Sequence, residues 1–131
     1  MARRQPSFFQ GAPMSNPQQD IQDWIRTTVA SNDVVLFMKG NKNMPQCGFS
    51  AQVDHILRGL GVEFKDVNVL QDLAIREGIK TYSNWPTVPQ LYIKGEFVGG
   101  CDIVREMLEA GELIAMFEDK GIAYDKASLT A

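Results

Sequence analysis

The sequence of 131 residues contains only two cysteines, Cys47 and Cys101, and a single histidine, His55. Two cysteines are too few for a disulfide framework. The two cysteines and the histidine are the usual zinc-ligand types, and their wide spacing in the sequence argues against a closed zinc site within one chain. Free cysteines are typical of a reducing compartment, so we expect a cytoplasmic protein.

Positive charge and long apolar runs are also scarce. Thirteen Lys and Arg residues against sixteen Asp and Glu residues give a net charge of -3, which excludes a general basic field for nucleic acid. No apolar run reaches the roughly 18 residues of a membrane span, so we expect no membrane partner. The length and the 44% hydrophobic content suit one globular domain with its own core.

Both ends of the chain differ in composition from the middle. Residues 1–19 are rich in Pro, Gly, Asn and Gln and lack an apolar period, which predicts a disordered leader. Residues 20–120 form the predicted domain, and residues 121–131 lose the helical pattern and are predicted to fray. An alternative interpretation of the leader is a transit peptide, because it contains arginine, serine and phenylalanine near the N-terminus. In that case the protein would be located in an organellar matrix.

Cys47 lies between two strongly apolar segments. Residues 34–38, Val-Val-Leu-Phe-Met, predict a buried strand, whereas apolar residues recur at helical spacing from Val53 to Leu60. Cys47 therefore falls where a strand-loop-helix unit enters its helix. Unpaired N–H groups and the positive helix end stabilise a thiolate, which makes such a cysteine a nucleophile or a metal ligand. A buried, inert thiol is the alternative interpretation.

The rest of the chain alternates between helical and extended patterns. A strand-helix-strand order in the first half predicts a parallel pair with a right-handed crossover, and the tight Lys94-Gly95 turn predicts an antiparallel hairpin. We therefore predict an α/β domain with a four-stranded mixed sheet flanked by helices. The expected elements are a helix from Asp20 to about residue 31, strand 34–38, a helix after Cys47, strand 62–67, a short helix 73–82 interrupted by Gly78, strands 90–93 and 96–98, and a last helical region from 101 with a break at Gly111.

Four motifs in the chain carry a family resemblance. They are Lys39-Gly40, Cys47-Gly48-Phe49-Ser50, Trp85-Pro86-Thr87-Val88-Pro89-Gln90-Leu91-Tyr92 and Gly95-Glu96-Phe97-Val98-Gly99-Gly100-Cys101-Asp102-Ile103. Together and in this order they resemble a monothiol glutaredoxin of the CGFS type, over roughly residues 20–120. The resemblance implies the thioredoxin-like (glutaredoxin) fold.

The resemblance also implies a glutathione site beside Cys47, to which several parts of the chain contribute. The implied contacts are Lys39 and Arg76 with the glycine carboxylate, Val88 with the peptide backbone, and Cys101 and Asp102 with the γ-glutamyl end. A cis peptide bond before Pro89 is a further implication.

Most of these residues also have an ordinary structural interpretation. The alternatives are solvated charge for Lys39 and Arg76, a helix N-cap for Asp102, a small buried residue for Cys101, and packing for Phe49, Trp24 and Trp85. Two glycines before Cys101 nevertheless place flexible backbone at a helix start, which presents free N–H groups to a carboxylate while Asp102 can pair with an ammonium.

Ser50 stands where a dithiol oxidoreductase carries its second cysteine, three positions after Cys47. A Cys-x-x-Cys pair resolves a mixed disulfide by intramolecular attack, which a serine cannot do. An oxidised Cys47 must therefore be resolved by external glutathione or, as the alternative, by Cys101.

The resemblance also implies a 2Fe-2S cluster held between two subunits, and the number of ligands that one chain offers is consistent with such sharing. Such a cluster requires four ligands, usually thiolates, and one chain offers a single well-placed thiol, Cys47. If each of two subunits contributes Cys47 and one bound glutathione, the four sulfurs are supplied and a homodimer follows. Gly48 would let the cluster approach the backbone, and Phe49 would shield it from water.

Two functional hypotheses follow. The first is an iron-sulfur carrier that passes its cluster to acceptor proteins and, as in the family, pairs with a BolA-like protein. The second is a glutathione-dependent monothiol oxidoreductase that removes glutathione from protein thiols, with Cys47 as nucleophile. The insert Asn41-Lys42-Asn43-Met44 lengthens the loop before Pro45, and in CGFS-type relatives such a loop goes with cluster binding, which favours the carrier.

Overall fold

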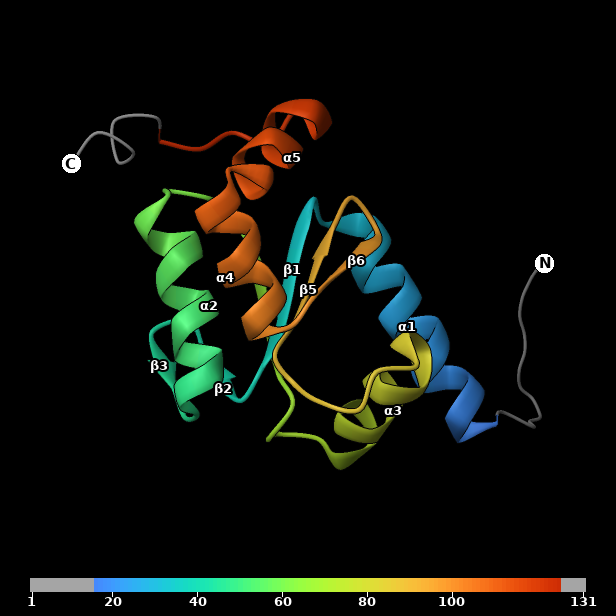
Figure 1. Ribbon diagram of the computed structural model, residues 1–131. Coiled ribbons are helices and arrows are strands. Elements are labelled where there is room, and N and C mark those ends of the chain that lie inside the picture. The colour runs from blue at the N-terminus through green and yellow to red at the C-terminus, as the bar shows by residue number, and fades with distance from the viewer. Residues whose placement is uncertain (1–15, 126–131) are drawn as a thin grey trace.

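A central four-stranded sheet organises residues 16–125, the part of the chain that the computed structural model describes (Figure 1). Its strand order is β4-β1-β5-β6. The strands are β1 (Val34–Met38), β4 (Lys65–Asn68), β5 (Gln90–Ile93) and β6 (Glu96–Gly99). β1 pairs in parallel with β4 and antiparallel with β5, which pairs antiparallel with β6. The predicted mixed sheet and thioredoxin-like fold are confirmed.

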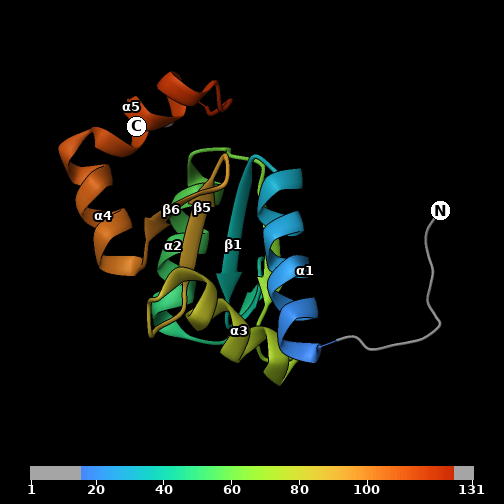
Figure 2. The same ribbon diagram turned by 90° about the vertical axis from the view of Figure 1, so that its right-hand side faces the viewer.

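Helices cover both faces of the sheet (Figure 2). Val34, Leu36 and Met38 of β1 pack in one core with α2, α4 and α5, whereas Val35 and Phe37 pack in the other with α1 and α3. Because β1 is covered on both faces, its sequence is a continuous apolar run rather than an alternating one. The helices are α1 (Pro17–Ser31), α2 (Gly48–Gly59), α3 (Leu73–Ser83), α4 (Cys101–Ala110) and α5 (Glu112–Lys120).

Helix α1 begins three residues earlier than Asp20, where the apolar pattern places its start. Oδ1 of Asn16 accepts hydrogen bonds from the backbone N–H groups of Gln18 and Gln19, at 2.9 and 3.3 Å, and Pro17 occupies the first helical position. A capping side chain followed by proline is a favourable helix start even without apolar residues. Residues 1–15 of the predicted leader lie outside the described residues.

Helix α3 is continuous, so the predicted interruption at Gly78 is wrong. Gly78 is buried where α3 crosses α1, and a Cβ atom there would lie 2.8 Å from Cγ2 of Ile21. The missing side chain lets the two helices approach, and the Gln22 amide donates to the carbonyl of Gly78 at 2.9 Å. The glycine therefore serves helix packing rather than helix termination.

The segment after α5 packs on the domain as far as residue 125. Ile122 is buried, and its N–H donates to the carbonyl of Phe117 at 2.8 Å. The N–H of Asp125 donates to the carbonyl of Leu60 at 2.6 Å. The predicted frayed tail therefore does not begin at Gly121, and the remainder of it, 126–131, lies outside the described residues. No helix within residues 16–125 is long and apolar enough to cross a membrane.

Replacing Gly78 by Ala should destabilise the domain by about 1–2 kcal/mol, because overpacking the contact with Ile21 outweighs the better helix propensity of alanine. The free energy of unfolding in urea measures this effect. Gly59→Ala is the matched control, since a Cβ at the end of α2 meets nothing within 4 Å. Equal stability of the two variants would contradict the close packing of α1 on α3.

Candidate functional site

Cys47 is the N-cap residue of α2, as the sequence predicts, and its thiol is half-buried and unbonded to Cys101. The backbone N–H of Ser50 is the largest influence that lowers the pKa of the thiol. The N–H of Phe49 and the charge of Lys39 lower that pKa further, while partial burial opposes them. This environment favours the thiolate over the thiol, and the partial exposure of Cys47 contradicts the interpretation as a buried thiol. The reactivity of the thiol stays a prediction.

Ser50 joins the end of β1 to the first turn of α2. Its side chain is fully buried, and its Oγ accepts a hydrogen bond from the backbone N–H of Lys39 at 3.0 Å. This bond fixes the start of the Cys47 helix against the residue that follows the central strand. Sequence reasoning considered Ser50 only for the thiol that it lacks.

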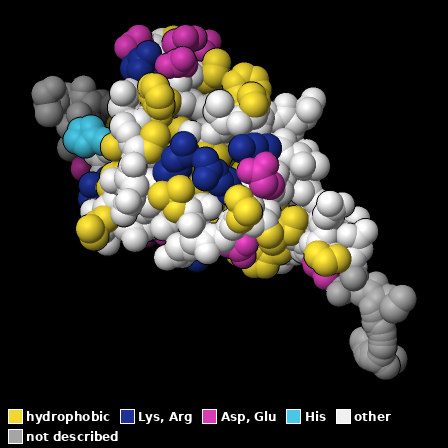
Figure 3. All heavy atoms as spheres, turned by 90° about the horizontal axis from the view of Figure 1, so that it is seen from below, with side chains coloured by type: hydrophobic (Ala, Val, Ile, Leu, Met, Phe, Trp, Pro, Cys, Tyr) yellow, Lys and Arg dark blue, Asp and Glu magenta, His cyan; other side chains and the backbone are white. Residues whose placement is uncertain are grey.

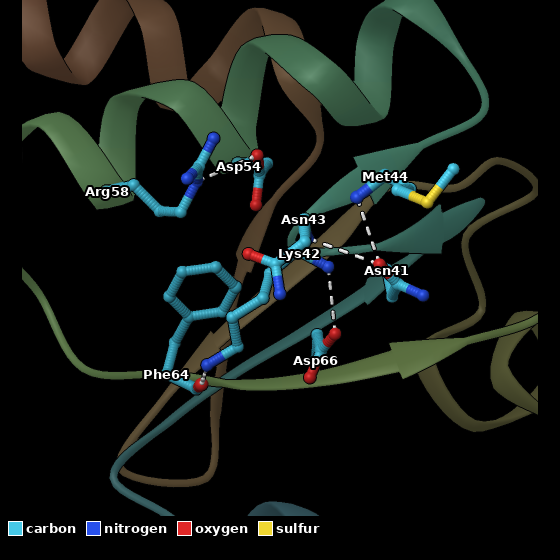
Figure 4. Close-up of polar contacts among 8 residues, drawn as sticks. All are labelled: Asn41, Lys42, Asn43, Met44, Asp54, Arg58, Phe64 and Asp66. Carbon is cyan, nitrogen blue, oxygen red and sulfur yellow. Dashed lines mark hydrogen bonds and ion pairs between the residues drawn. The ribbon is translucent and has the colours of Figure 1, made fainter.

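The insert before Cys47 forms a small hairpin of β2 (Gly40–Asn41) and β3 (Met44–Pro45) that the sequence did not predict. Lys42, at its turn, is anchored on β4 (Figure 4). Its N–H donates to the Asp66 carboxylate at 2.8 Å, and its ammonium donates to the carbonyl of Phe64 at 2.6 Å and lies 4.6 Å from the centre of the Phe64 ring. The insert is therefore a tethered element rather than a loose loop.

A cationic cavity of about 330 Å³ opens beside Cys47. Lys39, Arg76 and Lys80 line it together with Cys47 and Phe49. Lys and Arg side chains also gather near the centre of the face shown in Figure 3. The structure thus brings Lys39 and Arg76 together, as the resemblance implied, and adds Lys80, which sequence reasoning missed.

Val88 stands in the middle of the site and lines both this cavity and a second one of about 190 Å³. Its peptide bond to Pro89 is cis, as the resemblance implied. Neither its N–H nor its C=O is hydrogen-bonded to another described residue. The fully buried Gln90 supports the segment 85–89, which contains Val88. The amide of Gln90 donates to the carbonyls of Trp85 and Thr87 at 3.3 and 3.1 Å.

The second cavity reaches the start of α4, where Gly100, Cys101 and Asp102 line it. The N-cap of α4 is Gly100, so the interpretation of Asp102 as the cap is wrong. The Asp102 side chain is 75% exposed. Cys101 is buried, its thiol donates to Oε1 of Gln52 at 3.1 Å, and burial raises its pKa. The two cysteines therefore differ in exposure and in the direction in which their surroundings shift the thiol pKa.

The aromatic residues of the site are more exposed than packing residues would be. Phe49 is 60% exposed and Trp85 41% exposed, and both line the second cavity. The core-packing interpretation of Phe49 is therefore wrong. That of Trp85 holds in part, because its ring packs 6.0 Å from that of Phe97 while the residue remains exposed. Trp24 is likewise exposed, on α1, and lines neither of the two cavities.

Because the two cavities share Phe49, Thr87 and Val88, they form one groove with an activated thiol beside it. Cations mark one end of the groove, and a carboxylate and a helix N-terminus mark the other. The fold and the site together define a thioredoxin-like protein with one half-buried cysteine at the N-terminus of a helix.

Comparisons with known proteins narrow this class. A family model described as Glutaredoxin matches residues 34–98. The chain is 58% identical over 97 residues to "Probable monothiol glutaredoxin 2" of Rickettsia typhi, which covers 74% of this chain and 87% of the relative. The chain therefore belongs to the glutaredoxin family, among its monothiol members.

Two solved structures support the same assignment. A monomeric truncated mutant of Trypanosoma brucei 1-C-Grx1 matches with a TM-score of 0.72 and 45% identity, covering 87% of this chain and 97% of that one. A buckwheat glutaredoxin in complex with glutathione matches with a TM-score of 0.72 and 27% identity, covering 83% and 97%.

Replacing Lys39 by Gln should raise the pKa of Cys47, because the lysine charge favours the thiolate. Alkylation by iodoacetamide across a pH series, in a Cys101→Ser background, measures this pKa, since only the thiolate reacts. The midpoint should move to higher pH. Lys94→Gln is the control, because Lys94 pairs with Asp33 at the opposite end of the sheet. Identical midpoints would show that Lys39 does not act on the thiol.

Replacing Lys42 by Met should loosen the insert, because it removes the ammonium bond to Phe64. We expect amide hydrogen exchange at Asn43, Met44 and Gln46 to accelerate about tenfold, a change that corresponds to ~1.4 kcal/mol. Lys65→Met removes an equal charge from an exposed position of β4 and should leave this exchange unchanged. Equal exchange in both variants would mean that the insert does not depend on Lys42.

Proposed function

We propose that this chain binds glutathione in the groove and, as a homodimer, holds a bridging 2Fe-2S cluster that it passes to acceptor proteins. The observation that carries the proposal is the position of the activated Cys47 thiol beside a groove with opposite charges at its ends. In this scheme the cluster is cargo rather than a permanent part of the protein.

Glutathione fits the charges along the groove. Its glycine carboxylate suits the end that carries Lys39 and Arg76, and its γ-glutamyl ammonium suits Asp102. The unpaired backbone groups of Val88 offer hydrogen bonds to the peptide between these ends. Bound in this direction, the ligand would bring its own thiol to Cys47. The glutathione complex of the buckwheat relative supports the choice of ligand.

The donor set supports a cluster shared between two chains. Cys47 is accessible and inclined to ionise, whereas Cys101 is buried and its thiol already donates to Gln52. Each chain would thus supply one protein thiolate and one bound glutathione thiolate, and two chains would supply the four sulfurs that a 2Fe-2S cluster needs.

Exposed apolar side chains support the same arrangement. Phe49, Trp85 and Ile103 border the groove and are at least 39% exposed. A second copy placed over the cluster would cover them, and Phe49 would exclude water from the cluster sulfurs. A cluster held partly by exchangeable ligands suits transfer to acceptors better than permanent storage. In this proposal the protein works in the cytoplasm and also pairs with a BolA-like protein.

A second candidate function follows from the same thiolate. Cys47 would attack a glutathionylated protein thiol, so that the protein thiolate leaves and a disulfide forms between Cys47 and glutathione. A second glutathione thiolate would then attack the glutathione sulfur, releasing oxidised glutathione and regenerating the Cys47 thiolate. The accessibility and lowered pKa of Cys47 favour this route, whereas the tethered insert and the apolar rim favour the carrier.

Anaerobic reconstitution with iron, sulfide and glutathione separates the two functions. The carrier predicts a coloured dimer whose visible absorption disappears almost completely in Cys47→Ser or when glutathione is omitted. Cys101→Ser is the matched control and should retain the colour, because Cys101 is not a ligand in this scheme. A colourless monomer that rapidly turns over a glutathionylated peptide would overturn the carrier and leave the oxidoreductase.

A further inference from the structure

Arg105 lies beside Asp102 in the first turns of α4, outside the residues that the resemblance assigns to ligand binding. Its Nη2 pairs with Oδ1 of Asp102 at 3.3 Å, and its Nη1 donates to Oε1 of Gln52 at 3.0 Å. Gln52 belongs to α2, so this contact joins the helix that begins at Cys47 to the helix that ends the groove. The guanidinium is therefore held from two directions.

This second tether distinguishes Arg105 from an ordinary surface arginine. Arg26 forms the same kind of ion pair with Asp23, three positions earlier on its own helix, but no other helix holds it among the described residues. The Gln52 oxygen accepts from both Arg105 and the Cys101 thiol, so the buried start of α4 and the guanidinium share one anchor. The Arg105 side chain is 46% exposed, so its guanidinium is accessible to solvent beside Asp102, which lines the second cavity.

Asp102 remains available to a ligand in spite of this ion pair. Arg105 engages only Oδ1, and Oδ2 has no hydrogen bond or ion pair to another described residue. An exposed ion pair is weak and rearranges readily when a competing charge arrives. The carboxylate and the guanidinium thus stand side by side as one acceptor and one donor.

We infer that Arg105 is a specificity-determining residue for the α-carboxylate of a γ-glutamyl ligand, held in place by Gln52. This inference rests on the proposed glutathione site. A γ-glutamyl group ends in an ammonium and a carboxylate on the same carbon atom. Asp102 takes the ammonium, while Arg105 and the free N–H groups at the start of α4 take the carboxylate. Asp102 alone would not distinguish this end from a simple amine.

The test uses two tripeptides, glutathione and γ-aminobutyryl-cysteinylglycine, which lacks only the α-carboxylate. Calorimetric Kd values of the reduced, cluster-free protein for both give the preference for the carboxylate. Arg105→Gln should weaken glutathione binding about tenfold, leave the analogue within about twofold, and so reduce the preference about tenfold. Arg105→Lys should restore part of it. Arg26→Gln removes an equal charge from an equivalent ion pair and should leave the preference unchanged.

Gln52→Ala tests the positioning role separately. It should reduce the preference in the native background and have no further effect once Arg105 is Gln, whereas a merely structural role would lower both backgrounds alike. An unchanged preference in Arg105→Gln, or equal weakening of both tripeptides, would overturn the inference while the glutathione site stands. Failure of the native protein to bind glutathione would overturn the proposed function, and this inference with it.

Discussion

The hydrogen bond from the N–H of Lys39 to Oγ of Ser50 joins the end of the central strand to the first turn of α2, and the groove depends on this junction. It holds the backbone of Lys39 against the first turn of α2, whose N–H groups at Phe49 and Ser50 lower the pKa of Cys47. Because the serine is fully buried, water does not compete for the bond. The chemistry of the thiol therefore follows from how one strand meets one helix.

The walls of the groove depend in the same way on residues that never meet a ligand. Arg76 and Lys80 are four positions apart and share one face of α3, while Gly78 lies between them on the opposite face, against α1. Close packing at the glycine thus places the two cations. On the other wall, the buried Gln90 supports the loop that presents Val88, and the Tyr92 hydroxyl donates to Gln90 at 3.0 Å. Core packing therefore positions the cationic end and the middle of the groove.

Much of this arrangement could be predicted from the sequence, and the exceptions have physical causes. Buried strands and amphipathic helices have strong periods, so the four-stranded mixed sheet and the helix start at Cys47 are predicted correctly, although β4 begins at Lys65 rather than at residue 62. The two-residue strands of the insert are too short to show a period. A glycine within a helical pattern fits both a break and a close helix contact, and only the position of α1 distinguishes them. The start of α1 depends on one capping side chain rather than on apolar spacing.

The site residues that were missed share a different cause. Lys80 and Arg105 are charged residues on helix surfaces, where most such residues are merely solvated. The cavity beside Lys80 and the contact of Arg105 with Gln52 both depend on elements that are distant in the sequence. Phe49 was predicted to shield a cluster, with core packing as the alternative, and the fold leaves both Phe49 and Trp85 facing the groove. Local spacing does not determine which side chains face solvent at the start of a helix or in a loop. Which of these side chains line the groove therefore depends on contacts between distant segments, which local sequence patterns do not reveal.

Ser50 links the fold to the single-thiol chemistry. A cysteine at this buried position would put a weak sulfur acceptor opposite the N–H of Lys39. A second thiol here would therefore weaken the hydrogen bond that joins β1 to α2. With serine present, Cys47 has no neighbouring thiol to release it from a mixed disulfide, and no second ligand for a cluster. In the proposed carrier the missing sulfur comes from glutathione bound in the groove, and in the proposed oxidoreductase a second glutathione attacks the glutathione that the groove holds in the mixed disulfide. Occupancy of the groove by glutathione is therefore the common requirement of both functions, and the charges at its two ends control that occupancy.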